Sequence, residues 1–306
     1  MSRYVIERLG EALVAVWGIV TIVFVVTRML GDPAVLLLPL GTPEAQVAAL
    51  RAELGLERPM IIQYLDFLIR AVQGDFGLSY QFFRPAMDLV LERLPATAIL
   101  AGTSIVLGVI IGSLAGFVAA VKRGSFLEFL AMTVALLGQA TPVFWLGIML
   151  ILYFGVNLGW LPTGGWDSLA SLVLPVLTLS IFVAATVSRL FRSSMLDALS
   201  EDYVRTARAK GLPPGTVYTR HAGRNALIPV VTMVAILTAE LLGGSAVTET
   251  VFSWPGVGRL LLQAIENKDF PVIQAGVFLI AVIFVGTNLL IDLIYPLLDP
   301  RIRVTR

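Results

Sequence analysis

The chain has 306 residues, of which 57% are hydrophobic and 14% are charged, and its mean hydropathy is +0.87. Soluble domains are about half apolar and about a quarter charged, so this composition excludes an ordinary soluble protein and indicates one that is embedded in a membrane. The net charge of +1 is uninformative by itself, and the absence of cysteine excludes disulfides and cysteine metal sites.

Six apolar runs approach or exceed the roughly 20 residues that a bilayer core requires. They occupy residues 9–30, 97–121, 130–156, 169–191, 226–247 and 272–298. The first run resembles a secretory signal, but it is longer than a usual signal core and has no small-x-small cleavage site. We therefore predict that it is retained, in an all-α polytopic membrane protein with six transmembrane helices.

The distribution of basic residues predicts the orientation. With six spans, one side holds most of them: Arg3, Arg8, Lys122, Arg123, Arg189, Arg192, Arg205, Arg208, Lys210, Arg220, Arg224, Arg301, Arg303 and Arg306. The other side has fewer, diluted by acids: Arg51, Arg58, Arg70, Arg84, Arg93, Arg259 and Lys268. Because short loops rich in Lys and Arg stay in the cytoplasm, we expect both termini and the connector after the fourth span to face inward.

The long outer loop, residues 31–95, is predicted to carry two helices. One begins at the Thr-Pro-Glu of residues 42–44 and ends at Gly55, and Pro59 opens the other, which runs to Val72. One face of the second helix is predicted to be apolar: Met60, Tyr64, Leu65, Phe67, Leu68 and Ala71. We expect a small extracytoplasmic helical cap; the alternative is that these helices lie in the membrane interface.

Two shorter outer loops and the glycines inside the spans allow more than one interpretation. Trp160 and Trp166 are typical of an interfacial anchor. The amphipathic segment 259–265 either helps to close the outer mouth of a pathway or is a packing device. Small residues at four-residue spacing, such as Gly108 and Gly112, predict close helix approach, which suits a rocking bundle and a static one alike.

Several kinds of chemistry are excluded. The chain has no G-x-x-x-x-G-K-[ST] loop, so it cannot hydrolyse nucleotide itself. Its single histidine, His221, excludes an H-E-x-x-H or multi-histidine metal site. No paired carboxylate motif surrounds Asp292, which argues against intramembrane aspartyl chemistry. We predict no catalytic residue and no metal site.

Four of the polar residues inside the predicted spans are candidates for a transport pathway. A charge costs about 2.5–3.5 kcal/mol at the centre of a membrane helix, so it is retained for function or for pairing. Glu240 and Asp292 are candidate pathway-lining residues, with Gln139 and Asn288 as neutral partners; the alternative is that they form hydrogen-bonded packing pairs. Because a proton relay would need more ionisable groups, we expect the energy for any transport to come from a partner.

The connector between the fourth and fifth spans, residues 201–229, is strongly basic and predicts a short helix with both ends marked. Ser200 is the expected cap, and Glu201 and Asp202 place negative charge in the first turn. Gly211 is expected to stop the helix, and the prolines at 213 and 214 forbid its continuation.

This helix carries a narrow ridge of small side chains, flanked by basic residues. The ridge consists of Tyr203, Val204, Ala207 and Gly211 or Leu212, and Arg205, Arg208 and Lys210 flank it. We predict that the ridge enters a groove on a soluble partner and that the basic residues pair at its rim. The alternative is that the arginines contact anionic lipid, at about 1 kcal/mol each.

At these residues the chain resembles the permease subunits of binding-protein-dependent ABC importers, in the dipeptide, oligopeptide and nickel branch. The branch pattern YVRTARAKGL is reproduced at 203–212, with Arg205-Thr206-Ala207 in the place of the family's EAA and Gly211 as its glycine. A second pattern is matched at 220–231 except at Gly223, which we expect to loosen a second short helix. Further matches are at 31–33, 93–97, 141–147, 249–256 and 298–303.

The resemblance implies the type I ABC importer permease fold in a bacterial or archaeal cytoplasmic (inner) membrane. It implies an N-terminal span and extracytoplasmic loop at 1–96, a permease core at 97–299 and a cytoplasmic tail at 300–306. It assigns the ATPase-coupling role to Glu201, Asp202, Tyr203, Val204, Arg205, Thr206, Ala207, Arg208, Ala209, Lys210, Gly211 and Leu212.

The implied partners are a second homologous permease, two cytoplasmic ATPase subunits, an extracytoplasmic solute-binding protein and membrane lipid, with no nucleic acid. ATP and Mg would be held by the ATPase subunits, and this chain would bind no cofactor. The implied substrates are di- and oligopeptides; nickel, glutathione or oligosaccharide are alternatives within the same machinery. A gradient-driven carrier that uses Glu240 and Asp292, or a scaffold without transport, remains the competing class.

Overall fold

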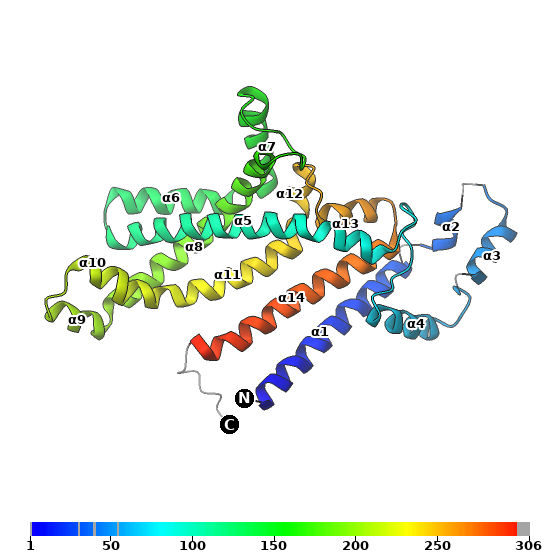
Figure 1. Ribbon diagram of the computed structural model, residues 1–306, viewed down its shortest axis with the longest axis horizontal. Coiled ribbons are helices and arrows are strands. Elements are labelled where there is room, and N and C mark those ends of the chain that lie inside the picture. The colour runs from blue at the N-terminus through cyan, green and yellow to red at the C-terminus, as the bar shows by residue number, and fades with distance from the viewer. Residues whose placement is uncertain (1, 30, 39–40, 54, 299–306) are drawn as a thin grey trace. The chain divides into compact units, whose positions relative to one another are not determined.

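The computed structural model describes residues 2–29, 31–38, 41–53 and 55–298. Within these ranges the chain is helical, and its only extended pairing is an isolated bridge between Leu78 and Pro85. The first helices are α1 (Ser2–Met29), α2 (Pro33–Leu37), α3 (Glu44–Glu53), α4 (Met60–Val72), α5 (Ala86–Val121), α6 (Phe126–Ala140), α7 (Val143–Leu150) and the π-helix η1 (Ile151–Asn157). They are followed by η2 (Leu169–Leu172), α8 (Val173–Ser200), α9 (Asp202–Ala209), α10 (Pro214–Thr216), the π-helix η3 (Val217–Gly223), α11 (Arg224–Gly244), α12 (Ala246–Val251), α13 (Val257–Glu266) and α14 (Phe270–Leu298) (Figure 1).

In the described part of the chain, 5 helical segments are long and apolar enough to cross a membrane. A bent pair, Phe126–Ala140 with Val143–Asn157, raises the number to 6 if it is one span. The third apolar run, expected as one helix over 130–156, is therefore broken, with a bend of 102°. The break follows from Pro142, which lacks an N–H and disfavours helical geometry in the residue before it; Thr141 is extended, with ψ 126°.

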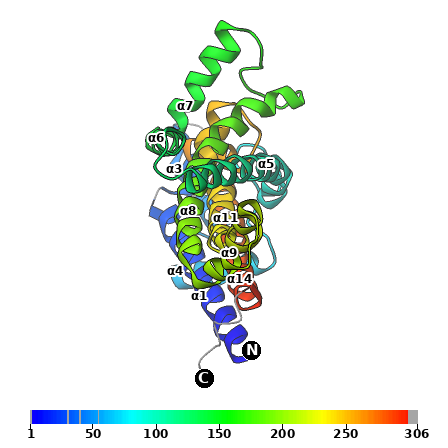
Figure 2. The same cartoon turned by 90° about the vertical axis from the view of Figure 1, so that its left-hand side faces the viewer.

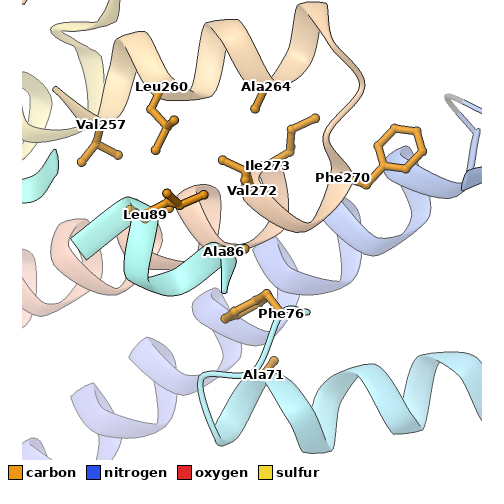
Figure 3. Close-up of a cluster of buried hydrophobic side chains, with 12 residues drawn as sticks. Ala71, Phe76, Ala86, Leu89, Val257, Leu260, Ala264, Phe270, Val272 and Ile273 are labelled. Atoms are coloured by element: carbon orange, nitrogen blue, oxygen red, sulfur yellow. The ribbon is translucent and has the colours of Figure 1, made fainter. Parts of the chain in front are cut away.

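The chain divides into two compact units, of which the first comprises Met1–Thr97 and Pro255–Leu289. Its core lies where α4, the start of α5, α13 and the start of α14 meet (Figure 3). The labelled side chains of this cluster are Ala71, Phe76, Ala86, Leu89, Val257, Leu260, Ala264, Phe270, Val272 and Ile273. The amphipathic segment predicted at 259–265 is α13, and it contributes Val257, Leu260 and Ala264 to this core, as a packing device does.

The two helices predicted in the long loop are α3 and α4, and Gly55 follows the first with a φ of +68°. The predicted apolar face of α4 is correct at Ala71, which is buried, and wrong at Met60 and Leu65, which are 63% and 50% exposed. The reason is that α4 carries a second apolar stripe on its exposed side, which includes Ile69. The prediction from sequence therefore assigned residues of both apolar stripes to a single face of α4.

The second unit comprises Ala98–Trp254 and Leu290–Arg306 and is built around α8. Helices α6, α7 and α11 pack against α8, and Figure 2 shows α8 beside α11. Helix α5 approaches α8 through glycines: a Cβ on Gly108 would lie 2.6 Å from Val183 Cβ, and one on Gly116 would lie 2.6 Å from the Ser188 carbonyl oxygen. This agrees with the close approach predicted from the glycine spacing.

Candidate functional site

The connector helix α9 follows α8 after one extended residue, Glu201, whose φ and ψ are −72° and 151°. The predicted capping role of Ser200 is wrong, because α8 continues past the end of the apolar run at residue 191 and includes Ser200 as its last residue. The Ser200 hydroxyl instead donates to the Asp197 carbonyl at 2.8 Å. Glu201 stands at the N-cap position and makes no side-chain capping bond.

The other end of α9 is closed by Gly211, as predicted. Gly211 has a φ of +74°, its N–H donates to the Arg208 carbonyl at 2.9 Å, and the Leu212 N–H donates to the Ala207 carbonyl at 3.3 Å. This pair of bonds satisfies carbonyls at the end of the helix and requires a left-handed residue, which glycine adopts without steric cost. Pro213 then stands in extended geometry, with a ψ of 144°, at the N-cap position of α10, so α9 does not continue.

The inner face of α9 is bound to the chain's own second unit. Val204 is completely buried and Ala207 is 4% exposed, because α9 packs against η3 and the end of α8. Met195 on α8 and Val217 on η3 are also buried. The predicted docking ridge is therefore wrong at Val204 and Ala207: an apolar stripe on a surface helix faces its own core, and spacing alone does not distinguish that from a partner's groove.

The face of α9 that remains exposed is polar and carries more basic than acidic residues. Its exposed residues, together with those of the following turn, are Asp202, Tyr203, Arg205, Thr206, Arg208, Ala209, Lys210 and Gly211. Arg205 reaches the Asp202 carboxylate at 3.4 Å, but their side chains are 77% and 94% exposed, so this ion pair contributes little and does not neutralise the surface. The connector thus presents a basic surface on a helix whose opposite face is fixed in the bundle.

The second part of the connector places Gly223 where a side chain does not fit. Gly223 is the last residue of the π-helix η3 and is buried. A Cβ at this position would lie 2.9 Å from the Tyr218 carbonyl oxygen. The lack of a side chain permits this close approach within η3, which packs against α9; the loosening expected at Gly223 stays a prediction.

The candidate pathway residues have different environments. Gln139 on α6 accepts a hydrogen bond from Arg189 on α8. Glu240 is exposed on α11 and forms no hydrogen bond or ion pair with the described residues. Asn288 is half-buried on α14 in the first unit, and the side chain of Asp292 lies outside the described residues. The structure therefore pairs Gln139 with a basic residue and does not pair it with Glu240.

Comparison with known proteins identifies the family. Residues 108–304 match the family described as "Binding-protein-dependent transport system inner membrane component", and residues 1–101 match the N-terminal region of such membrane components. The chain belongs to this family. The permease is 46% identical over 307 aligned residues to the "Glutathione transport system permease protein GsiC" of Escherichia coli strain K12, with 99% of each chain covered.

Two solved structures share the fold. An inward-facing MetNI methionine ABC transporter matches with a TM-score of 0.57 and 19% identity, over 70% of this permease and 97% of that chain. An amino acid ABC transporter solved with histidines matches with a TM-score of 0.53 and 18% identity, over 70% of this permease and 94% of that chain. The permease is thus a multi-pass membrane protein with the type I importer fold, and it is a transport component and not an enzyme.

Sequence reasoning missed Asp269, a buried acid in the first unit of the permease. Its carboxylate accepts the Ser79 hydroxyl and the Tyr80 backbone N–H, at 2.5 and 3.1 Å. Asp269 stands just before the first residue of α14, a position at which an aspartate is usually read as a helix cap. Its actual partners lie far away in the sequence, so no local signal reveals them.

Proposed function

We propose that this permease and a second, similar permease form the translocation pathway of an ATP-driven importer of short peptides. A solute-binding protein would deliver the peptide from outside, both termini would lie in the cytoplasm, and two cytoplasmic ATPase subunits would hold ATP and Mg. Membership of a family of binding-protein-dependent transport components supports this arrangement.

The observation that carries the coupling role is the two-sided character of α9. Val204 and Ala207 fix its inner face to η3 and α8, while Arg205 and Arg208 remain exposed on the other side. A helix held in this way moves with the helices behind it, so a force applied to its exposed face reaches α8 and α11. Closure of the ATPase subunits would draw the connector helices of the two permeases together and open the outward side, as in a rigid-body alternating-access transition.

Short peptides are the proposed substrates because the permease resembles a glutathione permease along almost its whole length, and glutathione is itself a tripeptide. Uptake into proteoliposomes that contain the complete transporter and its solute-binding protein distinguishes peptides from the nickel and oligosaccharide alternatives. We expect ATP-dependent uptake of labelled glutathione or of a dipeptide. Uptake of nickel or of an oligosaccharide alone would contradict the peptide assignment.

The coupling role is tested by Gly211→Val, with Gly215→Val as the matched control. Both glycines lie in the connector, and at both a Cβ would have no neighbouring atom within 4 Å, but only Gly211 has a positive φ, of +74°. A β-branched residue there opposes the turn that ends α9. We expect Gly211→Val to abolish substrate-stimulated ATP turnover with normal membrane insertion, and Gly215→Val to retain it; normal turnover in Gly211→Val would refute the assignment.

The competing gradient-driven carrier is tested through Glu240, the exposed acid on α11. If the permease is part of an ATP-driven importer, a protonophore should not stop uptake, but depletion of ATP should. This should hold for the wild type and for the Glu240→Gln variant. Uptake that stops with the protonophore while ATP is present would instead identify a carrier.

A further inference from the structure

The first unit contains a cavity of about 540 Å³ that is separate from the connector. It lies between the end of α1, the turn after α3, the helix α4, the loop at 75–83 and the start of α14. Its volume is within the range of roughly 300–1,000 Å³ typical of small-molecule sites. All of its lining residues belong to one compact unit, so the cavity does not depend on how the two units are arranged.

Arg28 supplies the cavity with a positive charge that has no ion-pair partner among the described residues. Its guanidinium carbon lies 5.5 Å from the centroid of the Phe24 ring, and it makes no hydrogen bond or ion pair with any residue that the structure describes. Asp32 acts on Arg28 through its charge, but the Asp32 carboxylate is already bound to the Arg51 side chain and to the Ala34 N–H. The hydrogen-bond donors of Arg28 are therefore left for a group that enters the cavity.

Tyr80 supplies a neutral donor in the same cavity. Burial raises the pKa of the Tyr80 phenol to about 12; the nearby Arg28 opposes this shift and Asp269 adds to it. Its hydroxyl has no hydrogen-bond partner within the described ranges, while its backbone N–H donates to Asp269 at 3.1 Å. The backbone is thus fixed and the hydroxyl remains available to donate.

The other charged groups of the lining are paired with each other or exposed. Arg58 pairs with Asp66 at 3.2 Å, and Asp75 accepts the Gly77 N–H at 2.9 Å. Glu53 and Arg70 are exposed. These groups therefore leave Arg28 as the inward cation without an ion-pair partner among the described residues.

The walls around Arg28 and Tyr80 are aromatic. Phe67, Phe76, Phe83 and Phe270 line the cavity; Phe270 stands edge-on to Tyr80 with ring centroids 6.3 Å apart, and Figure 3 shows Phe76 and Phe270 at the core of the unit. Aromatic walls with a few convergent polar groups are typical of a site for a ligand that has an apolar body and one charged end.

We propose that this cavity binds a small organic carboxylate with an apolar or aromatic body. The Arg28 guanidinium and the Tyr80 hydroxyl hold the carboxylate, and Phe67, Phe76 and Phe270 enclose the body. A guanidinium suits this role because its fork of N–H donors matches the two oxygens of a carboxylate. The site belongs to the first unit and is additional to the proposed transport of peptides.

The test compares two probes that differ only at the charged end. The complete transporter, in nanodiscs of phosphatidylcholine, is titrated calorimetrically with N-acetyl-L-phenylalanine and with N-acetyl-L-phenylalaninamide, in the absence of the solute-binding protein. We expect saturable binding of the acid at one site per chain, and binding of the amide at least about tenfold weaker, since charge-assisted hydrogen bonds are lost. Equal binding of the two probes, or no saturable binding of the acid, would overturn the proposal.

Two variants assign the contacts. Arg28→Gln is expected to weaken binding of the acid about tenfold or more, and Tyr80→Phe, which keeps the ring, about three- to tenfold. Arg93→Gln is the control, because it removes the same charge from an exposed position of this unit that does not line the cavity. Wild-type affinity for the acid in both Arg28→Gln and Tyr80→Phe would refute the site. The site would also be refuted if the cavity held a phospholipid instead, that is, a lipid retained by the wild type, lost in Arg28→Gln and not displaced by the acid.

Discussion

Ser79 and Asp269, which are 190 positions apart in the sequence, are joined by a hydrogen bond of 2.5 Å between two buried side chains. The backbone N–H of Gln81 also donates to this carboxylate, at 3.3 Å, and the Ser79 hydroxyl accepts the Phe82 N–H at 2.9 Å. One carboxylate thus orders the loop that carries Tyr80 and attaches it to the start of α14.

Replacing Asp269 by alanine should therefore destabilise the first unit. The change leaves the Ser79 hydroxyl and two backbone N–H groups without their acceptor, at a cost of about 2–4 kcal/mol. The measurement is thermal unfolding of the detergent-solubilised permease. Asp75→Ala serves as the control, because the exposed Asp75 accepts one backbone bond, and it should cost less than about 1 kcal/mol. Equal melting temperatures for the two variants would contradict the assigned role of Asp269.

The pKa of Tyr80 predicts a loss of stability in alkali. Burial raises it from 10.0 to about 12, so the folded protein keeps the phenol protonated at a pH where the unfolded chain has begun to ionise. The stability that this provides is complete below a pH of about 10 and is lost as the pH rises through about 12. Between pH values of about 10 and 12 the melting temperature of the wild type should fall more steeply with pH than that of Tyr80→Phe. Parallel plots of melting temperature against pH for the two proteins would contradict this role of Tyr80.

Close packing of α5 on α8 predicts opposite outcomes at two glycines of the same helix. A Cβ on Gly112 would lie 2.7 Å from the Ala184 carbonyl oxygen, while one on Gly102 would have no neighbour within 4 Å. Gly112→Ala should therefore destabilise the permease by about 1–3 kcal/mol through overpacking, and Gly102→Ala should be neutral or slightly stabilising. Thermal unfolding of both variants measures the difference, and a neutral Gly112→Ala would show that α5 and α8 are not in contact at this point.

The sequence predicted what depends on local chemistry. The glycine stop at Gly211 and the helix opened by Pro59 each follow from the backbone preference of one residue. The family, too, was readable from short motifs, because the connector pattern is contiguous in the chain.

The sequence did not predict the features that depend on which surfaces of the folded chain contact each other. The stripe of Val204 and Ala207 was assigned to a partner, but it faces η3 and α8. Ser200 has a capping side chain, but α8 continues through it. Asp269 is not recognisable as a site residue in the sequence because its partner Ser79 is distant in the chain. Arg28 is not recognisable because only the folded chain shows that it makes no hydrogen bond or ion pair with a described residue.

The exposed basic face of α9 leads to the last prediction, which separates an ATPase contact from a lipid contact. Reversing the charges of Arg205 and Arg208 together should weaken retention of the ATPase subunits, because both side chains are exposed beside the fixed inner face of the helix. The matched control is reversal of Lys122 and Arg123, two exposed basic residues in the short turn between α5 and α6. Anionic lipid attracts any basic residue near the membrane surface, at about 1 kcal/mol each, so a lipid role predicts similar losses of co-purified anionic lipid in both variants. A docking role predicts that only the α9 variant loses ATPase stoichiometry in a detergent pull-down, where little lipid remains. If that stoichiometry is unchanged in both variants, the basic face of α9 binds lipid and the coupling contact lies elsewhere in the connector.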